Sequence, residues 1–244
     1  MTSERPFKIA VSDDALALLK RKLDDTRLPD EVNAAEWACG APLADIRRLA
    51  GRWKDGYDWR THERALNDAL PMFTRDVAVD GFGELSVQYV HRRSAAERAI
   101  PLLFVHGCTY VPSSSSRFFL PCYVVGYGPL GPGSFLEVTK VLPLLTAVSA
   151  DHPSFHVVAP SLPGFAWSEG VLEKSFHAEH YAEVGVIWLL HGSILIELSL
   201  ATVLAQLFNK LMISLGYSEY VTQGGDWGHV VRTPPLFIFK QHVF

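Results

Sequence analysis

Three short segments, the first two almost wholly apolar, are each followed directly by a glycine-containing loop and constrain the fold of this chain more than any other feature. They are Ile100–Val105 before His106-Gly107, Phe155–Ala159 before Pro160–Gly164, and Tyr220–Gln223 before Gly224–Gly228. Continuous apolar runs are typical of strands buried on both faces of a parallel sheet. Helical material lies between these runs. The sequence therefore predicts an α/β fold whose mostly parallel sheet carries the functional site in loops at the carboxyl ends of its strands.

The chain before these runs predicts a mainly helical segment and two further strands. Ser12 is a good helix N-cap, and apolar residues recur at helical spacing from Ala15 to Leu23. The same spacing predicts helices from Pro42 to Trp53 and from Trp59 to Leu70. Strands are expected at Phe73–Val77 and Leu85–Val90, around the turn Gly81-Phe82-Gly83. The helical segment contains no chemical motif, so we expect it to serve for packing or covering.

Composition excludes several classes of protein and cofactor. The 244 residues are 48% hydrophobic and 20% charged, which is ordinary for a globular protein and unlike a disordered, collagen-like or coiled-coil chain. A net charge of −4 provides no basic surface for nucleic acid. The three cysteines, Cys39, Cys108 and Cys122, are too few and too scattered for a disulfide framework or a zinc site. No metal and no other cofactor is expected, and a reducing compartment is the simpler interpretation.

One segment complicates the expectation of a cytoplasmic protein. The amino terminus is polar and lacks the apolar core of a secretory signal. Val186–Leu204, however, is almost wholly apolar and about as long as a bilayer crossing requires. His191 and Glu197 lie within it and disfavour insertion. Membrane association through this segment therefore stays open as an alternative that is not favoured.

The run Gly224-Gly225-Asp226-Trp227-Gly228 has the form of a nucleophile elbow, with Asp at the place of the usual Ser. The glycines suit the sharp turn from strand to helix, which forces its central residue into a strained conformation. A glycine-rich turn with an Asp is usually no more than a turn. The catalytic interpretation gains weight from the other two loops, because both follow apolar strands in the order expected of an α/β-hydrolase.

With these motifs the chain resembles the epoxide hydrolases of the microsomal and juvenile-hormone type, which are α/β-hydrolases with an added N-terminal domain. The resemblance implies an epoxide-hydrolase-like N-terminal domain over residues 1–97 and a partial α/β-hydrolase core over residues 98–244. The matching segments are Arg27-Leu28-Pro29, Tyr57-Asp58-Trp59-Arg60, Glu63, Leu66-Asn67, Leu85–His91, Pro101–Gly107, Pro132–Leu145, Phe155–Val184 and Phe208–Gly228.

The resemblance implies hydrolysis of epoxides to vicinal diols through an aspartyl ester, a detoxification or epoxide-metabolism reaction. Asp226 is the expected nucleophile, and backbone N–H groups at Trp227, Gly107 and Cys108 are the expected oxyanion donors. The expected partners are a small apolar epoxide and water. An Asp suits this chemistry because a carboxylate attacking an epoxide carbon gives an ester that water can cleave, whereas a serine would give an ether. The remaining motif residues are His106, Pro132, Gly133, Gly224, Gly225 and Gly228.

Two segments interrupt the family pattern. The family's His-Gly-Trp-Pro-Gly-Ser-Phe loop is divided here by Cys108–Gly131, so the donor that the Trp supplies falls formally to Cys108. Removing Gly185–Leu207 would restore one amphipathic helix. Its stripe comprises Tyr181, Val184, Phe208, Leu211, Met212 and Leu215. We expect residues 108–131 and 185–207 to be insertions, and translated introns are our hypothesis for their origin.

The residues after Asp226 include His229 and His242 but no Asp or Glu. We assign neither histidine as the catalytic base, so a lid, an acid and a base are expected to be missing from these 244 residues. The chain as given is expected to be truncated and to show no steady turnover. Two alternatives stay open: a non-catalytic α/β-hydrolase-like protein that binds apolar ligands or partners, and a dehalogenase with an Asp nucleophile.

Overall fold

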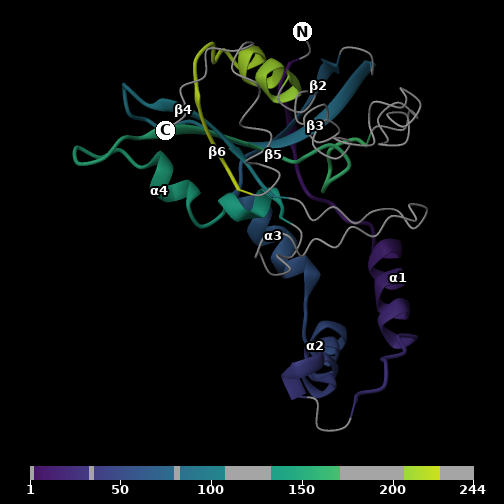
Figure 1. Ribbon diagram of the computed structural model, residues 1–244. Helices are drawn as coiled ribbons and strands as arrows, with labels where there is room; N and C mark the ends of the chain where they lie inside the picture. The colour runs from purple at the N-terminus through teal and green to yellow at the C-terminus, as the bar shows by residue number, and fades with distance from the viewer. Residues whose placement is uncertain (1–2, 33–35, 80–82, 108–132, 171–205, 226–244) are drawn as a thin grey trace, which may run out of the picture. The chain divides into compact units, whose positions relative to one another are not determined.

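A computed structural model describes residues 3–32, 36–79, 83–107, 133–170 and 206–225 (Figure 1). The chain divides into two compact units, one formed by Lys8–Ala69 and the other by Met1–Phe7 together with Leu70–Phe244. The elements are β1 (Arg5–Phe7), α1 (Asp13–Asp24), a 3₁₀ helix (Glu36–Cys39), α2 (Leu43–Asp55), α3 (Trp59–Ala69), β2 (Met72–Val79), β3 (Gly83–Arg92), β4 (Ile100–Val105), a 3₁₀ helix (Phe135–Val138), α4 (Leu142–Thr146), β5 (Phe155–Pro160), a helix over residues 206–214 and β6 (Val221–Gly224).

The second unit is built on a six-stranded sheet in the order β1-β2-β3-β5-β4-β6. The pairs β1–β2, β2–β3 and β3–β5 are antiparallel, whereas β4 is parallel to both β5 and β6. Parallel neighbours require crossover connections, and helical material supplies them. The predicted α/β fold with parallel strands β4, β5 and β6 is therefore confirmed.

The continuous apolar runs form the buried centre of this sheet. Val157, Val158 and Ala159 of β5 are fully buried, as a strand covered on both faces should be. The core combines side chains from the strands with those of the helix over residues 206–214. Its members include Val87, Tyr89, Val105, Val158, Phe208, Leu211 and Met212.

The helix over residues 206–214 confirms the described part of the predicted amphipathic stripe. Phe208, Leu211 and Met212 are completely buried, and Leu215 is 9% exposed. Leu207 is also buried, although the stripe did not include it. Tyr181 and Val184, the other two residues of the stripe, lie outside the described residues. The proposal that Gly185–Leu207 interrupts one helix therefore stays a prediction.

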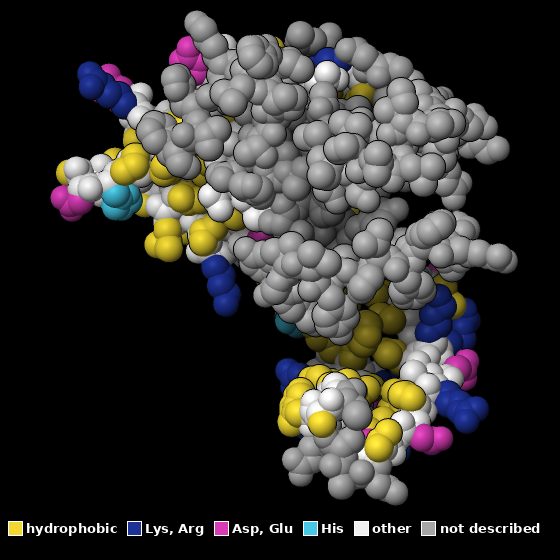
Figure 2. All heavy atoms as spheres, viewed as in Figure 1, with side chains coloured by type: hydrophobic (Ala, Val, Ile, Leu, Met, Phe, Trp, Pro, Cys, Tyr) yellow, Lys and Arg dark blue, Asp and Glu magenta, His cyan; other side chains and the backbone are white. Residues whose placement is uncertain are grey.

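The helical unit contains α1, α2 and α3 at the positions that the periodicity predicts. Ser12 caps α1, since its hydroxyl accepts the Ala15 backbone N–H at 3.2 Å. Apolar side chains also reach the surface of this unit (Figure 2), among them Leu49 and Trp53 of α2. Of the helices in the described ranges, none has the length and hydropathy for a membrane crossing. Val186–Leu204 lies outside those ranges.

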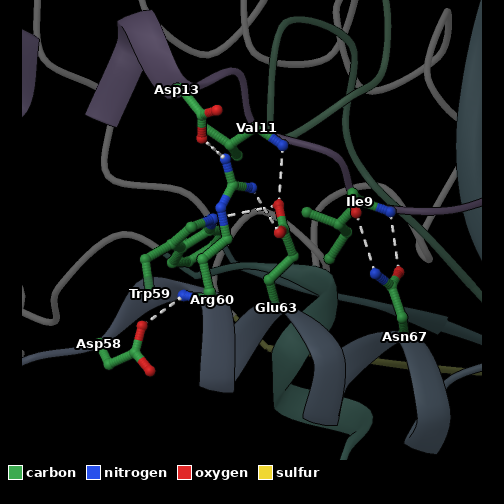
Figure 3. A network of polar contacts seen from close by, with 8 residues as sticks. All are labelled: Ile9, Val11, Asp13, Asp58, Trp59, Arg60, Glu63 and Asn67. Atoms are coloured by element: carbon green, nitrogen blue, oxygen red, sulfur yellow. Dashed lines mark hydrogen bonds and ion pairs between the residues drawn. The ribbon is translucent and has the colours of Figure 1, made fainter. Parts of the chain in front are cut away.

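Polar side chains of α3 hold the extended segment that precedes α1 (Figure 3). The Asn67 amide accepts the Ile9 N–H at 2.8 Å and donates to the Ile9 carbonyl at 2.9 Å, as a neighbouring strand would. Glu63 accepts the Val11 N–H at 2.7 Å and the Arg60 guanidinium at 2.6 Å. The hydrogen bond from the Val11 backbone N–H is the main reason that the pKa of Glu63 is lowered. The unit is thus held by side-chain bonds to backbone as well as by helix packing.

The domain boundary between residues 97 and 98 stays a prediction. In the structure β3 pairs with β5, so strands on both sides of that boundary share one sheet. The compact units divide at Phe7–Lys8 and Ala69–Leu70.

Candidate functional site

Strands β4 and β6 bring two of the predicted motifs to one edge of the sheet. They are parallel neighbours in a register that pairs Val105 with Gly224. His106 and Gly107 therefore follow one strand at the level where Gly225 follows the other. Three expected site residues, Asp226, Trp227 and Gly228, continue this chain outside the described residues.

His106 is buried at the end of β4 and is bonded through both ring nitrogens. Nε2 lies 3.2 Å from the backbone nitrogen of Leu162, which can only donate. Nε2 must therefore accept, and the ring proton resides on Nδ1, which donates to the Gly107 carbonyl oxygen at 2.7 Å. Burial lowers the pKa of His106, and the Gly107 carbonyl opposes this shift. His106 is accordingly a neutral bridge between the loops after β4 and β5.

Gly107 and Gly133 lie against each other although 25 residues separate them in the sequence. A Cβ on Gly133 would lie 2.9 Å from the carbonyl carbon of Gly107 and closer still to its oxygen. The next residue, Ser134, caps a 3₁₀ helix in which Glu137 accepts the Ser134 N–H at 3.2 Å. The residues that flank the predicted insertion thus lie together, while Cys108 and Pro132 lie outside the described residues.

The loop after β5 is held by polar side chains that the sequence alone did not single out. The Ser161 hydroxyl donates to the Gln88 side chain at 2.5 Å, and the Ser168 hydroxyl donates to the Ser161 carbonyl at 2.9 Å. All three residues are buried. In the sequence, these three residues are marked only by being polar at positions where a buried strand and its loop face inward. Between Phe165 and Trp167, Ala166 adopts a φ of 48°, a left-handed conformation that costs a residue with a Cβ free energy.

An apolar cavity of about 610 Å³ lies on one face of the sheet, beside α4. Leu102 and Phe104 of β4, Leu145 of α4 and Val221 of β6 contribute to its walls. Neither His106 nor Gly107 lines it, so this cavity is separate from the paired loops at the strand ends. Within the described ranges, no group of three or more His, Cys, Asp and Glu side chains is placed to hold a metal ion.

Comparison with known proteins relates these features to one family. The epoxide hydrolase N terminus family matches residues 4–118, a range that includes β1 to β4 and the His106-Gly107 motif. The chain is related to the epoxide hydrolases. It is 34% identical over 232 residues to a predicted epoxide hydrolase of Stigmatella aurantiaca, covering 93% of this chain and 41% of that protein. It is 27% identical to juvenile hormone epoxide hydrolase 2 of Ctenocephalides felis, covering 99% of this chain and 42% of the flea protein.

Solved epoxide hydrolase structures have the same fold. The Aspergillus niger enzyme superimposes with a TM-score of 0.64 at 26% identity, over 94% of this chain and 48% of that one. The juvenile hormone epoxide hydrolase of the silkworm Bombyx mori gives a TM-score of 0.68 at 24% identity, over 95% of this chain and 43% of that one. The described sheet is therefore an incomplete α/β-hydrolase fold, as the sequence predicted. These 244 residues span less than half the length of each of these relatives.

Proposed function

We propose that the protein hydrolyses epoxides to vicinal diols, with Asp226 as the nucleophile. The observation that carries this proposal is the β4–β6 register, in which Val105 pairs with Gly224. From that pair onward, His106-Gly107 and Gly225 leave the sheet side by side, and Asp226 follows Gly225 in the sequence. This is the arrangement that an Asp elbow and an oxyanion loop need. The kinship with epoxide hydrolases supports the choice of substrate class.

The proposed reaction has two steps, formation of an ester and its hydrolysis. In the first, a carboxylate oxygen of Asp226 forms a bond to an epoxide carbon, the epoxide C–O bond breaks, and the released alkoxide takes a proton from solvent or a donor. An Asp needs no base for this attack because its carboxyl group is already ionised at neutral pH. In the second step, water adds to the carbonyl carbon of the ester, and the tetrahedral intermediate releases the diol and restores Asp226.

Backbone N–H groups after Gly107 and after Asp226, at Cys108 and Trp227, are the proposed donors to the oxyanion of the second step. Such donors act when the carbonyl oxygen gains charge, and each contributes about 2.7–4 kcal/mol to the stabilisation of that transition state. The lack of a side chain at Gly133 lets its backbone approach the Gly107 carbonyl closely, which supports an ordered loop next to the proposed donors. The glycines Gly224, Gly225 and Gly228 are proposed to serve the turn that presents Asp226.

In the 244-residue chain the ester is expected to accumulate. No Asp or Glu follows Asp226 within these 244 residues, and His229 and His242 are not assigned as bases, so we expect water to attack the ester without a His–acid pair. A covalent adduct is therefore a more direct readout of the proposed function than steady diol formation.

Intact-mass spectrometry of the chain incubated with a small aromatic epoxide tests the proposal. The expected result is a single adduct with the mass of the epoxide, absent from the Asp226→Asn variant. The matched control Asp151→Asn, at an exposed position before the amino end of β5, should form the adduct at the normal rate. An adduct that persists in Asp226→Asn would refute Asp226 as nucleophile. The absence of any adduct in a folded, unmutated chain would refute the function.

A further inference from the structure

His106 differs from buried His91, whose two ring nitrogens bond to side chains, because both partners of its ring are backbone groups. It does not line the apolar cavity beside α4, and it joins the carbonyl of Gly107 to the N–H of Leu162. The ring centroid of Phe165 lies 5.9 Å from that of His106, with the two rings tilted relative to each other. Both ring nitrogens are thus saturated, so His106 is available neither as a base nor as a ligand.

We infer that His106 is a positioning residue for the oxyanion donors, and this inference rests on the proposed function. The carbonyl oxygen of a peptide and the N–H of the following residue lie in one plane and point in opposite directions. The Nδ1–H of His106, by holding the Gly107 oxygen at 2.7 Å, fixes the direction of the N–H that follows Gly107. His106 acts through this peptide and does not itself contact the reacting atoms.

Gly133 limits the same peptide from another side. A side chain there would collide with the carbon and oxygen of the Gly107 carbonyl and with the carboxylate of Glu137. That carboxylate is itself held by the Ser134 N–H. The Gly107 peptide therefore has a donor on one side and closely packed backbone on the other, which leaves it little freedom to rotate.

The two steps of the proposed reaction depend on this peptide differently. During ester formation, negative charge leaves the Asp226 carboxylate for the epoxide oxygen, so donors at the carboxylate give no acceleration. During ester hydrolysis, negative charge develops on the ester carbonyl oxygen, which is where the donors act. Loss of the hydrogen bond from His106 to the Gly107 carbonyl should therefore slow ester hydrolysis and leave ester formation unchanged. General damage to the fold would slow both steps.

Two amide substitutions separate the two bonds of His106. The amide N–H of Asn in His106→Asn can replace Nδ1–H toward Gly107, but it cannot reach Leu162. The longer amide of His106→Gln can accept the Leu162 N–H, but it leaves the Gly107 carbonyl without a donor. Both rates are measured by intact mass: adduct growth during exposure to an aromatic epoxide, and adduct decay after the epoxide is removed. The same ester in the urea-unfolded chain gives the uncatalysed rate of decay.

We expect unchanged adduct formation in both variants. Adduct decay should slow by about 10²–10³-fold in His106→Gln, unless it first reaches the rate of the unfolded chain. It should slow much less in His106→Asn. Equal losses in the two variants, or parallel losses in both steps, would overturn the inference. Nuclear magnetic resonance of the unmutated chain with nitrogen-15 labelled histidine adds a test that needs no turnover. A proton on Nδ1 of His106 supports the proposed hydrogen bond to the Gly107 carbonyl. A proton on Nε2 refutes it, even if no ester forms.

Discussion

Replacement of Gly133 by alanine should destabilise the sheet-containing unit by about 1–3 kcal/mol, the usual cost of overpacking a close contact. The added Cβ would lie 2.9 Å from the Gly107 carbonyl carbon. Carbon atoms prefer separations of about 3.5–4.0 Å, so backbone must move by about 0.5–1 Å. The colliding atoms are mainly backbone, which cannot rotate away as the end of a side chain could.

Urea unfolding followed by tryptophan fluorescence measures this cost. With a slope of about 2 kcal/mol per molar urea, the midpoint should fall by about 0.5–1.5 M. Gly170→Ala is the matched control in the same unit, because its Cβ would meet Gly164 at an ordinary 3.5 Å. That variant should stay within about 0.5 kcal/mol of the parent. An unchanged midpoint for Gly133→Ala, or an equal loss in Gly170→Ala, would refute the close approach of Gly133 to Gly107.

Three other expectations concern the helical unit, the histidines and the first interruption. Asn67→Ala removes two side-chain hydrogen bonds to Ile9 and should lower the stability of the helical unit by about 1–3 kcal/mol in urea unfolding. Asp68→Ala, its exposed neighbour, should not. Burial lowers the pKa of both His91 and His106, so the folded protein binds fewer protons than the unfolded chain below about pH 6.5. The free energy of unfolding should therefore fall as pH drops from about 7.5 to 5.5, and a flat profile would contradict the neutral, buried state of these rings. Replacing Cys108–Gly131 by a single Trp should preserve the circular dichroism and cooperative unfolding of the chain, because Gly107 and Gly133 already lie together; loss of folding would show that the segment is integral.

The sequence predicted the strands well because burial on both faces leaves a pattern that depends on few other residues. Val157 to Ala159 is apolar at every position, and the structure buries each of them. The stripe of Phe208, Leu211 and Met212 likewise predicted a helix face without knowledge of its partner. The spacing of apolar residues therefore predicted those helices and strands whose apolar side chains lie in the core.

Contacts between residues distant in sequence were not predictable in the same way. The Asn67–Ile9 and Glu63–Val11 bonds join residues 58 and 52 positions apart, and the polar partners leave no periodic signal. The short strand β1 was missed because its three residues are mostly exposed and gain their place by pairing with β2. The bonds of Ser161 and Ser168 around Gln88 were missed for a similar reason. Within the site, the family pattern predicted His106-Gly107 next to Gly133, whereas the two hydrogen bonds of the His106 ring leave no signal in the sequence.

The central claim, that Asp226 becomes an ester which water then cleaves at its carbonyl carbon, is tested most directly with oxygen-labelled water. The chain is allowed to react once with an aromatic epoxide in water containing heavy oxygen, and the adduct is left to decay. Mass analysis of the peptide that contains Asp226 should then show one heavy oxygen atom in that carboxyl group, while the released diol carries none. Heavy oxygen in the diol with an unlabelled Asp226 would mean that water attacks the epoxide directly and would contradict the account.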